Sequence, residues 1–145
     1  MNADKENRAA REARYAARDV TDKLGLKPGL AVRIVGKADR ALLVKVRAKI
    51  GRGFIPEKET ADVVLYWAAS DAEITRILRR LKRGIAPNGD IWVITFKKGK
   101  GKPYVIDRAL IAAGLKAGLV DNKICSISDT QSAMRFVIRR EDRSQ

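Results

Sequence analysis

Two long apolar segments separated by an amphipathic one constrain the fold of this chain more than any other feature. Residues 63–67 (VVLYW) and 91–96 (IWVITF) are unbroken runs rich in β-branched and aromatic residues. A strand with one wet face alternates apolar and polar residues, whereas a strand covered on both faces does not. Between the runs, apolar residues recur at the spacing of one helix face: Ile74, Ile77, Leu78, Leu81 and Ile85. The segment predicts a strand, a crossover helix and a second buried strand, which form a right-handed βαβ unit.

Both ends of this predicted helix carry sequence signals. Ser70 and Glu73 have the spacing of a capping box, in which each side chain bonds the backbone N–H of the other residue. Pro87, Asn88 and Gly89 are turn formers. We therefore expect them to end the helix and to turn the chain into the next strand.

Further elements extend this unit on both sides. A helix is predicted after the N-cap Asp39, and another at residues 104–119. The last two predicted strands form a hairpin. We expect an α/β protein with a three-layer, Rossmann-like, mostly parallel sheet of about five or six strands, an antiparallel C-terminal hairpin and helices on both faces. The additional strands are predicted at residues 31–35, 54–55, 123–129 and 134–139.

The chain length is that of a single sheet-centred domain, at 145 residues. We assign residues 21–145 to this domain. Residues 1–20 are rich in Ala and Arg and contain few large apolar side chains. This composition predicts a helix or a flexible arm that becomes ordered on a partner.

The chain is strongly basic, with 31 Lys and Arg against 17 Asp and Glu and a net charge of +14. Two blocks inside the predicted domain hold the excess. Residues 27–58 carry nine basic and two acidic side chains, and residues 76–103 carry nine and one. An excess within folded segments predicts a basic surface that attracts polyanions, rather than a disordered basic tail.

Three groups of residues are candidates for contacts with phosphate. Arginines line the polar face of the central helix with no acidic residue between them. A glycine–lysine loop follows the second buried strand, at the strand end where open α/β sheets bind ligands, and an adjacent tyrosine is placed to stack on a base. A third group flanks a predicted helix N-terminus, whose unpaired amides favour an anion. An ordinary solvated surface is the alternative for each group. The candidates are Arg76, Arg79, Arg80, Arg83, Lys97, Lys98, Lys100, Lys102 and Tyr104, and, at the helix N-terminus, Gly36, Lys37 and Arg40.

Missing residue types narrow the chemistry. The chain has no histidine and one cysteine, Cys125, in a predicted strand. Ser-His-Asp catalysis is therefore excluded, no metal site is expected, and Cys125 is expected to be a small core residue. No apolar run reaches the ~18 residues of a membrane span, and the N-terminus lacks the apolar core of a signal peptide. We expect a cytoplasmic protein without membrane contact.

Parts of the chain resemble two known groups of proteins. The order of elements, with a turn before a buried strand and a closing antiparallel hairpin, resembles a shortened class I methyltransferase fold. Five further motifs are LGLKPG (24–29), PNGDIWV (87–93), FKK (96–98), GLVDNKIC (118–125) and DTQSAMRFVIRRE (129–141). This set is similar to a family of small bacterial proteins known only as a domain of unknown function. The resemblance covers roughly residues 22–143 and departs from the family at Gln131, where a Trp is usual. It implies a methyltransferase-like sheet without an established activity.

The methyltransferase resemblance implies S-adenosylmethionine, which the residues themselves disfavour. In such folds several glycines follow the first strand, and an acidic residue after the second strand bonds the ribose hydroxyls. Here the first strand is followed by one glycine, Gly36, and by cations. The first carboxylates after residues 54–55 are Glu57 and Glu59, beyond Pro56. We therefore expect no cofactor, with S-adenosylmethionine as the disfavoured alternative.

Three functions remain open at this point. The first is a non-catalytic, methyltransferase-like binding module whose basic surface contacts nucleic-acid phosphates or another polyanion, with an affinity that falls steeply with salt. The second is an S-adenosylmethionine-dependent methyltransferase or another nucleotide-using enzyme. The third is a scaffold for an acidic protein partner, with residues 1–20 as the docking arm. We favour the first, and with it a protein that is not an enzyme.

Overall fold

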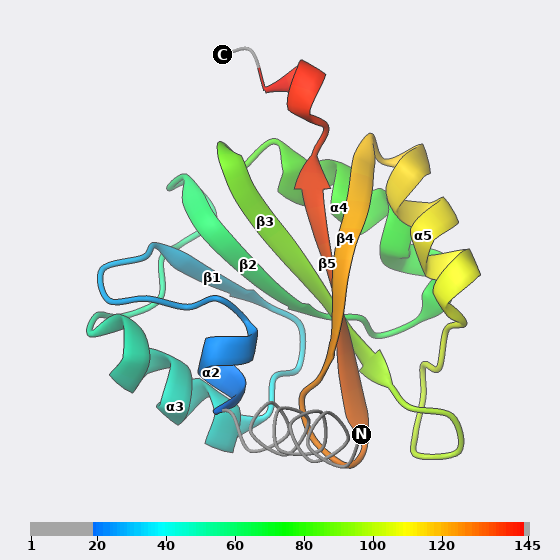
Figure 1. Ribbon diagram of the computed structural model, residues 1–145, viewed down its shortest axis with the longest axis horizontal. Coiled ribbons are helices and arrows are strands. Elements are labelled where there is room, and N and C mark those ends of the chain that lie inside the picture. The colour runs from blue at the N-terminus through cyan, green and yellow to red at the C-terminus, as the bar shows by residue number, and fades with distance from the viewer. Residues whose placement is uncertain (1–18, 144–145) are drawn as a thin grey trace, which may run out of the picture.

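The computed structural model describes residues 19–143 (Figure 1). The predicted N-terminal arm, residues 1–20, lies outside the described residues except for its last two. No helix in the described part is long and apolar enough to cross a membrane. The helices are α2 (Val20–Lys23), α3 (Arg40–Ile50), α4 (Ile74–Lys82) and α5 (Asp107–Lys116), with the short 3-10 helices η1 (Asp71–Glu73) and η2 (Arg140–Asp142). The strands are β1 (Val32–Val35), β2 (Ala61–Trp67), β3 (Ile85–Phe96), β4 (Leu119–Ser126) and β5 (Gln131–Ile138).

Within residues 19–143 these five strands form one sheet in the order β1-β2-β3-β5-β4. β1, β2 and β3 run parallel to one another, and β5 runs antiparallel to both β3 and β4. The expected α/β class is confirmed, as is the antiparallel C-terminal hairpin. The expectation of a mostly parallel sheet is met only in part, because β5 makes its pairings with both neighbours antiparallel.

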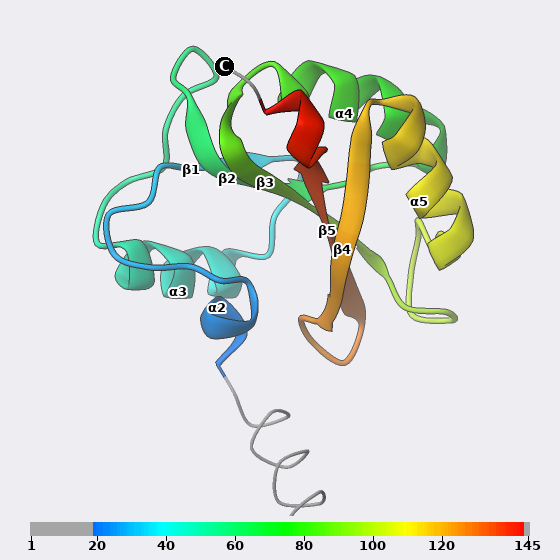
Figure 2. The ribbon, with the colours of Figure 1, turned by 45° about the horizontal axis from the view of Figure 1, so that its top comes forward.

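Helices cover both faces of the sheet. Figure 2 shows α4 on one side of the sheet and α2 and α3 on the other. Apolar side chains of α4 and α5 pack on the face that carries Val64 and Phe136, and those of α3 pack on the face that carries Leu65 and Trp92. The middle strands are therefore buried on both sides, which explains why their sequences do not alternate.

The predicted βαβ unit is confirmed as β2, α4 and β3, and its helix starts differently from the prediction. β2 and β3 are parallel neighbours, and α4 lies across them on one face. The predicted capping box is wrong, because the Ser70 side chain makes no capping hydrogen bond. The Glu73 carboxylate instead accepts a hydrogen bond from the Tyr66 hydroxyl at 2.6 Å. This bond ties the start of the helical segment to the carboxyl end of β2.

The start of β3 also differs from the prediction. The turn formers at residues 87–89 lie inside the strand, because β3 begins at Ile85. Pairing with β2 slips there, from Ala61 opposite Ile85 to Val63 opposite Asp90. The turn residues therefore form a bulge within β3. A bulge places extra residues in one strand while the strand itself continues.

β1 is an edge strand of the described sheet. In six-stranded doubly wound sheets of order 3-2-1-4-5-6, two further strands lie on that side of the first. Here the connection between α3 and β2 takes their place. The short strand predicted at residues 54–55 is reduced to one hydrogen bond, from the Ile55 N–H to the Val32 carbonyl at 2.9 Å. The buried Arg33 guanidinium holds the rest of the connection by donating to the carbonyls of Pro56, Glu57 and Glu59.

Candidate ligand-binding site at the carboxyl ends of the strands

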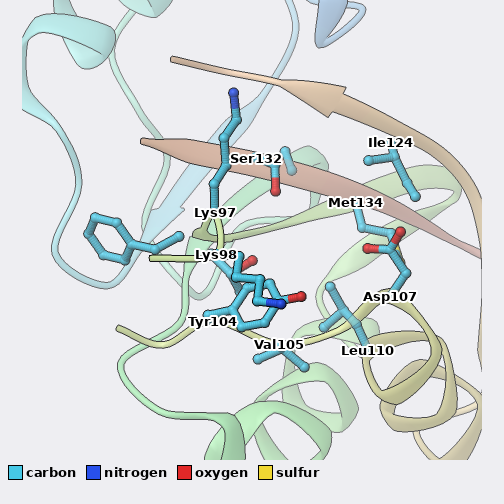
Figure 3. A pocket seen from close by; sticks show the side chains of 12 residues that line it. Lys97, Lys98, Tyr104, Val105, Asp107, Leu110, Ile124, Ser132 and Met134 are labelled. Carbon is cyan, nitrogen blue, oxygen red and sulfur yellow. The ribbon is translucent and has the colours of Figure 1, made fainter. Parts of the chain in front are cut away.

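The carboxyl ends of β1, β2 and β3 meet at one edge of the sheet, which we call the carboxyl edge. Open α/β sheets bind ligands at this edge, and three cavities lie here. The strand-end cavity, about 440 Å³, is lined by residues 37–39 and 67–69, Ile94, Phe96, Lys102 and Gln131. The loop cavity, about 570 Å³, is lined by residues 69–71, Gly99 and residues 101–104. The hydroxyl pocket, about 180 Å³, is lined by residues 95–98, 104–105, Asp107, Leu110, Ile124 and residues 132–134 (Figure 3).

Two backbone segments approach each other closely beside the strand-end cavity. Gly36 directly follows β1 and has a φ of +92°, a conformation open to glycine and strained for other residues. A Cβ atom added to Gly36 would lie 2.2 Å from the Trp67 carbonyl oxygen. One glycine is thus enough to bring the ends of β1 and β2 together.

The polar side of the strand-end cavity is the start of α3. Asp39 is the N-cap of this helix, as predicted, and one of its carboxylate oxygens accepts a hydrogen bond from the Ala41 N–H at 3.2 Å. The first turn of a helix leaves further amides unpaired and carries a partial positive charge. Lys37 and Lys102 line the same cavity, so the predicted helix N-terminal site and the glycine–lysine loop meet here. Arg40, the first residue of α3, is exposed and does not line it.

The apolar side of the cavity contains an unpaired donor. Trp67 is 5% exposed and lines the cavity together with Ile94 and Phe96. Its indole N–H has no hydrogen-bond partner among the described residues. A buried donor left unsatisfied costs about 1–3 kcal/mol. The Nε1 atom is itself buried, so this N–H stays without a partner inside the described fold.

The lysine loop, residues 97–103, is anchored at its base. The Phe96 N–H donates to the Pro103 carbonyl at 2.9 Å, which closes the loop. Gly101 packs on Phe96 so closely that a Cβ atom would lie 2.4 Å from the ring. The backbone of the loop is therefore held in place, while its side chains stay available for contacts.

The lysine side chains of this loop are mostly free. The Lys97 ammonium donates to the Ser126 hydroxyl at 2.7 Å. Lys98, Lys100 and Lys102 are exposed and form no ion pair with any residue between 19 and 143. Three of the four predicted lysines are thus without an ion pair in the described part of the chain, and two of them, Lys98 and Lys102, line the cavities.

The predicted arginines of α4 lie elsewhere, since none of them lines a carboxyl-edge cavity. Arg79 donates through Nε and Nη2 to the Lys116 carbonyl, at 3.3 and 3.2 Å, and so joins α4 to the end of α5. Arg80 lies 3.5 Å from the Glu57 carboxylate. Arg76 and Arg83 are exposed and form no ion pair within the described part of the chain.

Groups with shifted pKa values lie outside the strand-end cavity. Burial raises the pKa of Asp90, and the hydrogen bond from Arg135 at 2.5 Å opposes this effect. Burial, followed by the bond to Glu73, raises the pKa of Tyr66. Burial also raises the pKa of the Cys125 thiol, which is a core residue as predicted.

Sequence reasoning missed part of the carboxyl edge. Thr95 and Ser132 line the hydroxyl pocket, but they lie 37 positions apart in the chain and meet only through the pairing of β3 with β5. Asp107, at the start of α5, lines the same pocket. A hydroxyl inside an otherwise apolar strand, as at Thr95, is the one signal that could have drawn attention to it.

Solved structures with a similar fold include several methyltransferases. NcsB1, an O-methyltransferase from neocarzinostatin biosynthesis in complex with S-adenosyl-L-homocysteine, is 16% identical over 76% of this chain and 50% of its own, with a TM-score of 0.60. CalO1, a methyltransferase in calicheamicin biosynthesis in its S-adenosyl-L-homocysteine-bound form, is 17% identical over 95% and 59%, with a TM-score of 0.60. A methyltransferase from Aquifex aeolicus is 14% identical over 83% and 88%, with a TM-score of 0.54. The chain spans half the length of NcsB1, and no curated protein matches it.

These structures establish the methyltransferase-like fold and correct the expectation of no cofactor. NcsB1 has also been solved with S-adenosylmethionine, so proteins of this fold hold the ligand that the sequence argument disfavoured. The prediction relied on the single glycine after β1 and on the missing acidic residue after residues 54–55, and neither feature describes the cavity that forms at the strand ends. In the structure Gly36 packs against the Trp67 backbone, and the residues that follow Gly36 and Trp67 line a cavity of about 440 Å³.

A family model covers most of the described chain. Residues 21–140 match the family described as "Protein of unknown function (DUF3052)". The match spans the sheet, its helices and all three cavities of the carboxyl edge. The predicted resemblance to a small domain of unknown function is thereby confirmed, and the chain belongs to the DUF3052 family.

Proposed function

We propose that the strand-end cavity binds an adenosyl ligand of the S-adenosylmethionine class. The carrying observation is the place of this cavity, where the ends of β1 and β2 meet at Gly36 and α3 begins. Its volume of about 440 Å³ lies in the range of ~300–1,000 Å³ typical of small-molecule sites. NcsB1 and CalO1, which hold such ligands, support the proposal by their shared fold.

The lining residues match the parts of such a ligand. Its amino-acid carboxylate would be held by Lys37, Lys102 and the free amides of α3. Asp39 uses one oxygen as a helix cap, and the other is left for a ribose hydroxyl or the α-amino group. The ring of Trp67 offers an apolar surface for the adenine. In this arrangement Asp39 takes the place of an acidic residue on the absent second strand.

The loop cavity lies directly beside the strand-end cavity. S-adenosylmethionine, when bound, supplies an electrophilic methyl group on its sulfonium sulfur. Ala69 and Lys102 line both the strand-end cavity and the loop cavity, so these residues would position a second molecule next to the adenosyl ligand. A non-catalytic role stays a prediction, which an assay of methyl transfer would test.

Ligand binding is measured without relying on activity. S-adenosyl-L-homocysteine is titrated into the full chain by calorimetry, and thermal unfolding is followed at a hundredfold excess over the Kd. Binding at that excess stabilises the native state by about 2.7 kcal/mol, which for a chain of this size raises Tm by roughly 5–10 °C. Absence of both heat and a Tm shift at millimolar ligand would overturn the proposal.

A matched pair of variants assigns the binding to the cavity. Ala69→Leu adds volume at a cavity-lining position, whereas Ala112→Leu adds the same volume at an exposed position of α5. We expect Ala69→Leu to weaken binding at least tenfold and Ala112→Leu to leave it unchanged. Equal affinities for the two variants would place the ligand elsewhere.

A second proposal is that the lysine loop binds nucleic-acid phosphates or another polyanion. It is favoured by Lys98, Lys100 and Lys102, which are exposed, unpaired cations on an anchored backbone. Contacts of this kind position a backbone without reading sequence, and they release counterions. The affinity for a single-stranded oligonucleotide should therefore fall steeply with salt. An affinity that stays constant between low and high salt would contradict this proposal.

A further inference from the structure

Two side-chain hydroxyl groups form the polar floor of the hydroxyl pocket, and neither has a hydrogen-bond partner among the described residues. Thr95 on β3 and Ser132 on β5 are cross-strand neighbours, and both line the pocket. Thr95 is 4% exposed. Neither hydroxyl forms a hydrogen bond with any other residue of the described chain. Each hydroxyl can donate and accept, so together they could pair with a polar edge that carries both donors and acceptors.

Above this floor the walls are apolar and partly aromatic. Figure 3 shows Ile124 and Met134 on one side of the pocket and Val105 and Leu110 on the other. Tyr104 is 44% exposed and also lines the pocket. The Tyr104 ring has no ring contact with another described residue. An exposed ring of this kind is suited to stack on a flat group, and base–aromatic stacking is the common way of holding an unpaired base.

The rim of the pocket carries charges of both signs. Asp107 lies between the two walls, and Lys98 lies beside Tyr104 (Figure 3). The Asp107 carboxylate disfavours a bare anion inside the pocket and can accept a hydrogen bond from an amino group. Lys98 forms no ion pair within residues 19–143 and can hold a phosphate outside the pocket.

The size of the pocket limits its occupant. Its volume is about 180 Å³, below the ~300–1,000 Å³ of sites that enclose a whole drug-sized ligand. The occupant that fits is a small, flat, neutral ring with a hydrogen-bonding edge, attached to an anionic group that stays outside. A nucleobase on its sugar-phosphate backbone has these properties.

We infer that the hydroxyl pocket holds one base of a single-stranded nucleic acid whose phosphates lie on the lysine loop. Thr95 and Ser132 bond the edge of the base, Tyr104 stacks on it, and Asp107 accepts from an exocyclic amino group. The inference rests on the proposed polyanion site and adds a base site to it. Adenine and cytosine, which carry an exocyclic amino group, are therefore preferred to uracil.

The test compares two probes on the full chain by fluorescence anisotropy. One is a short single-stranded oligonucleotide of adenosines, and the other has the same length and charge but abasic sugars. Stacking of one base should make the adenosine probe bind about 5- to 150-fold more tightly. Thr95→Val and Ser132→Ala should reduce this ratio several-fold, because each removes a hydroxyl from the floor. Thr60→Val, at an exposed position before β2, is the control that leaves the ratio unchanged.

The other possible results separate a failure of the base site from a failure of the polyanion site. Equal, salt-dependent binding of the two probes would overturn the base site and leave the polyanion proposal standing. If neither probe bound at low salt, the polyanion proposal would fail. Adenosine would then be titrated against the ¹⁵N-labelled chain, and shifts of the Thr95 and Ser132 amides would retain the pocket, whereas their absence would overturn it. If Thr95→Val did not fold, the wild-type ratio and Ser132→Ala alone would decide.

Discussion

The two ends of the same sheet use their charged side chains in opposite ways. At the amino ends of the strands two arginines are fixed. Arg33 is 4% exposed and donates to three carbonyls, and Arg80 pairs with a carboxylate of the connection between α3 and β2, which we call the β1 edge connection. A Cβ atom on Gly84 would lie 2.6 Å from the Arg33 guanidinium, so the packing there is tight. At the carboxyl edge, Lys98 and Lys102 are exposed beside the cavities and form no ion pair among residues 19–143.

The excess of basic residues in the sequence therefore serves two purposes. Arginines at the amino ends of the strands stabilise the fold, whereas lysines at the carboxyl edge are available for binding. Arginine presents several donors in a fixed plane and suits a site where many carbonyls converge. Lysine is a point charge on a flexible stem and suits a surface that meets mobile phosphates. We therefore assign the fixed arginines to stability and the exposed lysines to binding, and the following experiments test this assignment.

The largest expected effect is the loss of Arg33. Arg33→Ala leaves the carbonyls of the β1 edge connection without their donor, and unsatisfied buried acceptors cost about 1–3 kcal/mol each. Because part of this connection is exposed and can turn to water, we expect a loss of about 3 kcal/mol in the free energy of unfolding, measured by urea titration. The control, Lys98→Ala, should stay within about 0.5 kcal/mol of wild type. A loss below about 1 kcal/mol for Arg33→Ala would show that other contacts hold this edge.

The next effect is on binding rather than stability. Two double variants remove the same charge: Lys98→Gln with Lys100→Gln on the loop, and Arg79→Gln with Arg80→Gln on α4. Each phosphate contact to a single strand contributes about 0.7 to the slope of log K against log salt. We expect the lysine pair to lower this slope by about 1.4 and to leave stability unchanged. The arginine pair should leave the slope unchanged and cost about 0.5–1 kcal/mol of stability. Equal slopes for the two variants would contradict the claim that the loop lysines bind phosphates and the α4 arginines do not.

A smaller effect concerns pH and Asp90. Burial raises the pKa of Asp90 above 3.8 in the native state, against the effect of Arg135. Between 3.8 and the raised value the native state holds more protons than the unfolded state, so stability falls as pH rises through that window. Asp90→Asn removes this titration. The stability of wild type relative to Asp90→Asn should therefore be greatest at acid pH and decline towards neutrality; parallel curves would refute the assigned direction.

The sequence predicts the middle of the fold well because that information is local. Apolar runs and helical spacing between Ala61 and Phe96 lie within one contiguous segment, and β2, α4 and β3 follow from them. The bulge at residues 87–89 was predicted as a turn, because turn formers signal a break in regular structure without saying whether a strand continues around it. The spacing of Ser70 and Glu73 predicts a helix cap. The actual partner of Glu73 is Tyr66, and the sequence does not reveal this bond because it depends on tertiary structure.

The site is predictable only where it follows from strand direction. Lysines after a buried parallel strand must lie at the carboxyl edge, and Lys97 to Lys102 do. The hydroxyl pocket was not predictable, since Thr95 meets Ser132 through strand pairing and Asp107 through the approach of α5. The sequence disfavours S-adenosylmethionine for a related reason. Motif counting after β1 carries no information on how near the backbone of Gly36 comes to Trp67.

The most direct test of the central claim is a titration of the ¹⁵N-labelled chain with S-adenosyl-L-homocysteine, read at both ends of the sheet. The account predicts chemical-shift changes at the amides of Gly36, Lys37 and Ala69, which border or line the strand-end cavity, and none at Gly84 beside Arg33. Shifts confined to Gly84 and its neighbours, or no shifts at saturating ligand, would contradict it.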